Sequence, residues 1–136
     1  MPPKSVPGAI NPDVTQANIM QTVCVPNWSL SVRPPTSYTN ALKLSMLKAL
    51  GLPGTISVYE GDHRVEIAGG GAPRDPRNIW DQPMDEARLK DRLEAFEHRQ
   101  LCSGKISLKD EQAIFLGNFW KTYDQLAPQQ GWPVWK

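Results

Sequence analysis

The sequence predicts a single α+β domain, in which a β-hairpin leads into a long helix and further helices surround this pair. Three observations support this. The chain has 136 residues, enough for one hydrophobic core but not for two. β-rich segments lie at residues 55–59 and 64–67, and residues 84–101 have helical spacing. The composition, with 40% hydrophobic and 21% charged residues, is that of a globular protein.

The ends of the chain differ from its middle. Residues 1–12 contain four prolines and a glycine, which predicts an extended N-terminal arm. The domain itself is expected over residues 13–127, and residues 128–136 form a C-terminal tail. Its two tryptophans, Trp132 and Trp135, are expected to fold back onto the domain.

The first half of the domain is predicted as a short helix over 13–21, a non-helical loop over 25–35 and a helix over 39–50. The loop contains three prolines, which disfavour helix. Leu42, Met46, Leu47 and Leu50 fall at helical spacing, and Gly51 followed by Pro53 ends that helix.

The hairpin is expected to place Asp62 and His63 at the junction between its two strands. Residues 64–67 alternate apolar with charged side chains, as a half-buried strand does. The segment 69–73, with three consecutive glycines, must be a turn or loop.

Two helices are predicted after the hairpin. Pro83 opens the first, which runs to Leu101 and ends at Ser103-Gly104. Ser107 caps the second, which is expected to end before Pro128.

The helix over 84–101 has two distinct stripes. Leu89, Leu93 and Phe96 are spaced to face the core. A second stripe, roughly opposite, consists of Ala87, Asp91, Glu94 and His98. Its three polar residues could be metal ligands in line, or a solvated face held by i,i+3 and i,i+4 pairs.

Asp62 and His63 together suit metal-assisted hydrolysis. The carboxylate could anchor a divalent ion, while the imidazole takes a proton from the attacking water. Histidine suits this role because its ordinary pKa lies near working pH. An isolated Asp-His pair is nevertheless common in proteins.

The order of these pieces resembles the HNH, or ββα-metal, nucleases, and in particular a group of small bacterial HNH-like proteins that are often exported. The resemblance rests on Tyr59–His63, Gly70–Trp80 and Ala87–Asp91, and extends to Asn11–Thr15, Cys24–Pro26, Ser31–Pro35 and Cys102–Ile106. It therefore covers most of the chain.

The resemblance implies roles for particular residues. His63 matches the general base, Asp62 a metal ligand, and Asn78 the asparagine that ties the loop together through backbone hydrogen bonds and orients the base. In relatives with two helix histidines, the ligands lie nine and thirteen residues after the asparagine. Those positions are Ala87 and Asp91 here, so only Asp91 can bind a metal.

The chain also departs from the pattern. Asp91 is the first choice for the missing ligand, with Glu94 and His98 as further candidates. Gly61, Glu66 and Ala68 stand where the group has Leu, Pro and Glu; if Arg64–Ile67 is a strand, the displaced acid stays on the same face but about 7 Å away.

These residues predict an endonuclease that hydrolyses phosphodiester bonds with Mg²⁺, or alternatively Mn²⁺ or another divalent ion. Nucleic acid, DNA rather than RNA, is the expected partner, with Arg64, Arg77 and Arg88 holding phosphates; no membrane association is expected. The alternative is a catalytically degenerate ββα domain that binds nucleic acid or protein. The net charge of +1 and the departures at Glu66, Ala68 and Ala87 motivate it.

Cys24 and Cys102 could form a disulfide or remain free thiols, and spacing makes zinc binding improbable. Both match the exported proteins that the chain resembles, which favours pairing and a secreted or periplasmic location. No signal peptide is visible at the N-terminus.

Overall fold

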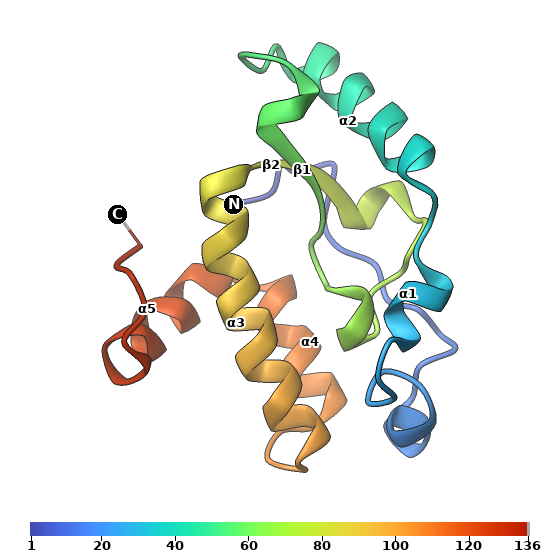
Figure 1. The fold of residues 1–136 in the computed structure, drawn as a ribbon, viewed down its shortest axis with the longest axis vertical. Helices are drawn as coiled ribbons and strands as arrows, with labels where there is room; N and C mark the ends of the chain where they lie inside the picture. Colours follow the sequence, from blue (N-terminus) through green and yellow to red (C-terminus); the bar gives the residue numbers. More distant parts are fainter. Residues whose placement is uncertain (136) are drawn as a thin grey trace.

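The computed structural model describes residues 1–135 as one α+β domain with a two-stranded antiparallel hairpin (Figure 1). The elements in chain order are η1 Gln16–Gln21, α1 Trp28–Val32, α2 Thr36–Leu50, η2 Ile56–Val58, β1 Tyr59–His63, η3 Ile67–Gly69, η4 Pro76–Asn78, β2 Ile79–Pro83, α3 Met84–Cys102, α4 Leu108–Leu116 and α5 Phe119–Gln130, where η denotes a 3₁₀-helix. Helices α2 and α3 contact the hairpin from two sides, and α4 and α5 pack against α3.

The hairpin pairs β1 with β2 through a long connection, residues 64–78. Tyr59 lies opposite Pro83, and His63 lies opposite Ile79. The expected strand over 64–67 is wrong: Val65 and Ile67 are buried, but this segment bends into η3 and pairs with no strand. The alternation of apolar and charged residues over 64–67 therefore reflects burial of Val65 and Ile67 and not a strand. The other expected strand, 55–59, is mostly η2, and β1 begins at Tyr59.

Helix α3 forms as expected and organises the main core. Pro83 precedes it, and Asp85 and Glu86 in its first turn suit the positive end of the helix dipole. Leu93 is fully buried. The other buried members of this core are Val6, Val65, Trp80, Phe115, Phe119, Trp120, Tyr123 and Ala127. The N-terminal arm therefore contributes to the core through Val6.

The segment before the hairpin is more helical than expected. Residues 28–32 form α1, although 25–35 was predicted to be non-helical. The prolines at 26, 34 and 35 lie outside these five residues, so they limit the helix without preventing it. Asn27, at the start of α1, has a φ of 68°, a left-handed conformation that Asn adopts more readily than most residues. Helix α2 begins at Thr36, directly after Pro35.

The helix predicted from Ser107 onward is two helices. Chain direction changes at Gly117 and Asn118, between α4 and α5. Pro128 lies inside α5 rather than beyond it, close to the C-terminal end and at an exposed position where water can replace the lost hydrogen bond. Trp132 packs edge-on against Phe96, and Trp135 stacks on Trp120 at 3.9 Å between ring centroids, so the expected folding back of the tail is confirmed.

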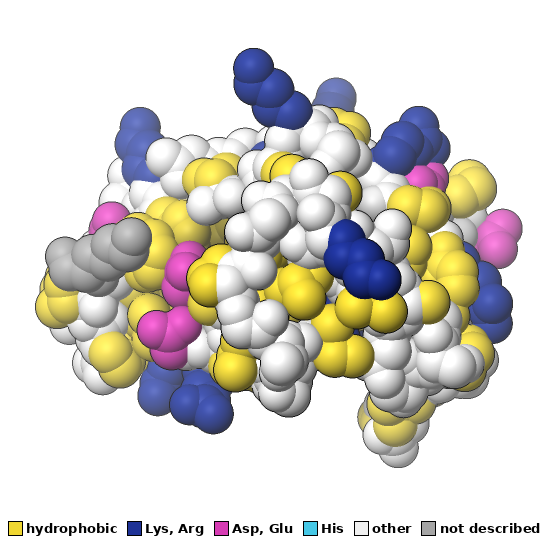
Figure 2. Space-filling model, turned by 90° about the horizontal axis from the view of Figure 1, so that it is seen from above, with side chains coloured by type: hydrophobic (Ala, Val, Ile, Leu, Met, Phe, Trp, Pro, Cys, Tyr) yellow, Lys and Arg dark blue, Asp and Glu magenta, His cyan; other side chains and the backbone are white. Residues whose placement is uncertain are grey.

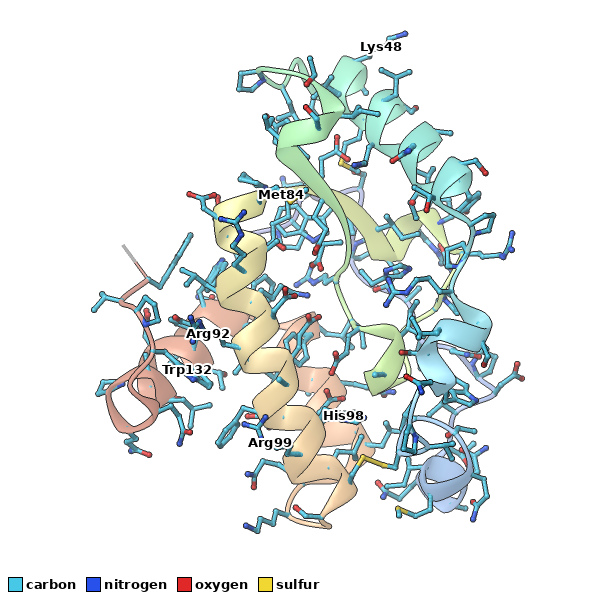
Figure 3. All side chains as sticks on the ribbon, viewed as in Figure 1. Lys48, Met84, Arg92, His98, Arg99 and Trp132 are labelled. Carbon is cyan, nitrogen blue, oxygen red and sulfur yellow. A yellow bond between two sulfur atoms is a disulfide. The ribbon has the colours of Figure 1, made fainter. Side chains whose placement is uncertain are left out.

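Cys24 and Cys102 form a disulfide, which confirms the predicted pairing. It joins the segment before α1 to the last residue of α3, beside a small second core that includes Val23 and Leu101 (Figure 3). Such a crosslink is compatible with an extracellular location. Within residues 1–135, no helix is long and apolar enough to cross a membrane.

Candidate active site

A cavity of about 240 Å³ lies where β1, η3 and α3 meet α1. Its wall is mostly polar. The lining residues are Ser29, Arg33, Glu60, Gly61, Asp62, His63, Glu66, Ile67, Ala68, Asp91 and Glu94. Five of these carry carboxyl groups, so the cavity is strongly acidic although the whole chain is nearly neutral.

Lys90 is the buried counter-ion of these acids. Its side chain is fully buried on α3, and its ammonium lies 2.8 Å from Asp62 Oδ2 and 2.8 Å from Glu94 Oε2. The ammonium also donates a 3.0 Å hydrogen bond to the His63 carbonyl. Burial disfavours the charged form, but Asp62 and Glu94 outweigh this effect and raise the pKa of Lys90. Lys90 is therefore a permanent cation at neutral pH.

His63 ends β1 and is buried in the cavity wall. Its Nε2 lies 2.9 Å from the Pro73 carbonyl, which can only accept, so Nε2 carries the hydrogen. In the neutral ring, Nδ1 then keeps a lone pair. Burial lowers the pKa of His63 below 6.5, and the Arg33 charge acts in the same direction. The imidazole is therefore neutral at pH 7 and can accept a proton.

Asn78 fastens the loop that carries the Pro73 carbonyl. Its side chain is fully buried; Nδ2 donates to the Val65 and Ala72 carbonyls, and Oδ1 accepts from the Val65 and Ala9 amides. Its own carbonyl accepts from the Arg64 amide at 2.7 Å. These backbone bonds are of the kind that the resemblance implies for this residue.

The remaining carboxyl groups of the cavity have raised pKa values. Burial, a hydrogen bond with Asp62 and the Asp62 charge raise the pKa of Glu60 to about 7. Burial also raises the pKa values of Glu66, Asp91 and Glu94. Glu66 Oε1 is buried and has no hydrogen-bond partner. The cavity thus holds more carboxyl groups than Lys90 pairs with, and their raised pKa values favour the protonated forms.

Glu111, from α4, lies behind this cavity and is fully buried. Neither of its carboxyl oxygens has a hydrogen-bond partner. Burial and the charges of Glu94 and Glu97 raise its pKa to about 8. Its carboxyl group packs so closely on Gly69 that a Cβ there would lie 2.7 Å from Oε2, which explains the glycine in η3.

The donor set fits a hard divalent cation, since Mg²⁺ and Ca²⁺ prefer carboxylate oxygens. The buried, unpartnered Glu66 Oε1 points the same way. Asp62, Glu66, Asp91 and Glu94 are the residues that could hold such an ion. Within residues 1–135, however, no three His, Cys, Asp or Glu side chains already form a ready-made metal cluster.

The structure brings together some of the predicted site residues. Asp62, His63, Asp91 and Glu94 share the cavity wall. His98 does not reach it: its Nε2 lies 2.8 Å from the Val23 carbonyl and 3.6 Å from Cys102 Sγ, on the side of α3 that faces the disulfide (Figure 3).

The three predicted phosphate-binding arginines differ in availability. The guanidinium of Arg64 is buried and donates to the carbonyls of Val6, Phe115, Leu116 and Gly117, so it holds the fold together and is not available to phosphate. Arg77 is exposed and paired with Asp75, and Arg88 is exposed on α3. Lys and Arg side chains are spread singly over the face that Figure 2 shows, without a continuous basic patch.

Sequence reasoning missed Glu60, Arg33 and Lys90 as parts of the site. Glu60 could have been predicted from the sequence, because residues two apart on a strand point to the same face and Glu60 is two residues before Asp62. Lys90 and Glu94 form an i,i+4 pair that the sequence spacing predicts, but nothing in the neighbouring sequence indicates that the pair is buried. Glu66 reaches the cavity from the N-cap of η3. Because residues 64–67 are not a strand, the expectation that its carboxylate is displaced along a strand face does not apply.

Comparisons of the chain with protein-family models, with curated proteins and with solved structures found no match.

Proposed function

We propose that this chain is a divalent-metal-dependent endonuclease of the HNH kind that hydrolyses phosphodiester bonds, with His63 as its general base. The observation that carries the proposal is the setting of His63: a buried imidazole in an acid-lined cavity, with Nε2 donating to the Pro73 carbonyl. A strand, a loop tied by Asn78, a second strand and a helix surround it in the order of a ββα-metal core.

His63 would take a proton from water at Nδ1. The hydrogen bond to Pro73 fixes the tautomer, and the loop bonds of Asn78 hold that carbonyl in place. Lys90 fixes the strand end from the other side by donating to the His63 carbonyl. The base is thus restrained at both its ring and its backbone, which suits it to act on a bound phosphodiester.

Asp62, with Glu66, Asp91 and Glu94 as further candidates, would hold the metal ion. When bound, a divalent ion supplies charge stabilisation to the phosphate and to the leaving oxygen. The carboxylates would hold the ion in the cavity that His63 lines. When no ion is bound, Lys90 would reduce the repulsion between the carboxylates.

The test is plasmid cleavage with Mg²⁺, Mn²⁺ or EDTA, by wild type and His63→Ala side by side. Cleavage should require metal and should fall by at least about 100-fold in His63→Ala, the usual scale for losing a general base. His98→Ala is the matched control, because that histidine lies outside the cavity. Retained cleavage by a folded, carefully purified His63→Ala protein would refute the assignment of the base.

The second candidate function is a degenerate ββα domain that binds nucleic acid or protein without turnover. The ion pairs of Lys90 favour it, since Asp62 and Glu94 already have a cationic partner. It predicts no metal-dependent cleavage by well-folded wild-type protein.

A further inference from the structure

The short helix α1 contributes Ser29 and Arg33 to the cavity wall, whose carboxylates come from β1, the N-cap of η3 and α3. Within residues 1–135, Arg33 is the one arginine or lysine in the cavity wall, at the C-cap of α1. Ser29 lies one helical turn before it and lines the same cavity. Helix α1 therefore offers hydrogen-bond donors, while the other elements offer acids and the base.

Arg33 is not used by the fold. Its side chain is exposed, and within the described chain its guanidinium forms no hydrogen bond or ion pair. This contrasts with Arg64, which donates to four carbonyls, and with Arg77, which Asp75 holds. Its charge nevertheless acts on the His63 ring. Its five N–H donors are therefore open to solvent and to a ligand that enters the cavity.

We propose that Arg33, assisted by Ser29, binds the non-bridging oxygens of the phosphodiester on which His63 acts; this inference rests on the proposed function. A guanidinium matches the fork of two phosphate oxygens, and it would offset the repulsion between the substrate and the acidic wall. Arg33 is thus the substrate-positioning residue of the cavity, and the ligand class is a phosphodiester monoanion.

The disulfide supports this assignment. Cys24 lies just before α1, and its bond to Cys102 ties that segment to α3, which carries Asp91 and Glu94. The disulfide therefore limits how far the segment that leads into α1 can move relative to α3.

The first experiment measures steady-state cleavage by wild type, Arg33→Ala, Arg33→Lys and Arg99→Ala. Arg99 is the matched control, since it lies near the C-terminal end of α3, outside the cavity wall (Figure 3). Arg33→Ala should lower kcat/KM about tenfold or more, mainly by raising KM, because a charge-assisted hydrogen bond to phosphate is lost. Arg33→Lys should recover part of the loss, since it restores the charge without the fork.

The second experiment measures binding without cleavage. A fluorescein-labelled DNA strand is titrated, at several KCl concentrations, with His63→Ala and with His63→Ala/Arg33→Ala. Loss of Arg33 should weaken binding about tenfold and reduce the salt slope by about one phosphate contact. Thermal melting of each variant confirms that it is folded.

The outcomes separate the two proposals. Active wild type with unchanged KM and unchanged salt slope in the Arg33→Ala variants would overturn the role of Arg33 and leave the nuclease standing. Inactive wild type whose DNA binding still depends on Arg33 would refute the nuclease and support the phosphate-binding role. Absence of both cleavage and binding would overturn both.

Discussion

Lys90 reduces the repulsion between the carboxylates of the cavity. Its ammonium contacts Asp62, Glu94 and the His63 carbonyl, all within about 3 Å. A buried ion pair adds little net stability when complete, but removing one partner leaves uncompensated buried charge. The acids of the cavity depend on this one cation as long as no other is bound.

Replacing Lys90 should therefore be costly. In the presence of EDTA, Lys90→Met should lower the free energy of unfolding by about 3–5 kcal/mol, because Asp62 and Glu94 lose their counter-ion. Added Mg²⁺ should restore part of the loss if these carboxylates can hold an ion. Urea unfolding with and without Mg²⁺ measures both effects, with Lys109→Met, at an exposed lysine, as the control. A Lys90→Met protein as stable as wild type would contradict this account.

Glu111 makes stability depend on pH in a defined direction. Its pKa is about 8 in the folded protein against an ordinary 4.5, so folding favours its protonated form. The stabilisation is complete below pH 4.5 and is lost as pH rises through 8. Each pKa unit corresponds to about 1.4 kcal/mol.

Glu111→Gln keeps the shape and removes the titration. The variant should match wild type near pH 5 and exceed it in stability at pH 9, as measured by urea unfolding in EDTA across this range. The difference between the two curves isolates Glu111 from other acids with raised pKa values, such as Glu66. Parallel curves for both proteins would show that Glu111 is ionised throughout.

At the scale of elements, the sequence predicts what depends on local signals. Helix α3 was predicted within one residue of its observed limits because its start, its stop and its stripes are all local. The strands were not, because fifteen residues separate β2 from β1 and the alternation at 64–67 reflects burial of Val65 and Ile67 against the core. Strand pairing is a long-range property that a short window of sequence does not encode.

The same distinction applies to the site. Asp62 and His63 were predicted from their chemistry and from the resemblance, Asn78 from the resemblance, Asp91 from helical spacing and the resemblance, and Glu94 from helical spacing. Arg33 and Lys90 were missed because their positions depend on how α1 and α3 pack on the hairpin. Both lie in segments that carry the resemblance, Ser31–Pro35 and Ala87–Asp91, but the resemblance assigns neither of them a role.

The Cys24–Cys102 crosslink should contribute strongly to stability. It closes a loop with a sequence separation of 78, for which the chain-entropy model gives about 4.5 kcal/mol. Cys24→Ser/Cys102→Ser should lose roughly this amount in urea unfolding, and dithiothreitol should destabilise wild type but not the variant. Equal sensitivity of both proteins to the reductant would argue against a crosslink in solution.

The whole molecule carries a net charge of +1, and the face drawn in Figure 2 shows no continuous basic patch. A nucleic acid on that face can therefore meet only a few cations at once. We expect the logarithm of the DNA-binding constant to fall with the logarithm of salt concentration with a slope no steeper than about −3. The titrations of fluorescein-labelled DNA at several KCl concentrations measure this slope. A value steeper than about −5 would contradict the expectation that only a few cations contact the DNA.

The crosslink also limits how far the chain can be stretched. Pulling on the chain from both sides of the bridge extends only the segments outside Cys24 and Cys102, because the disulfide joins these two residues at a Cα–Cα distance of 5.7 Å. Both strands, the cavity and nearly all of α3 lie inside the covalent ring and bear no tension along the chain. A protease that cuts the loop over 64–78 would likewise leave two fragments joined, so a nicked molecule stays in one piece until it meets a reductant.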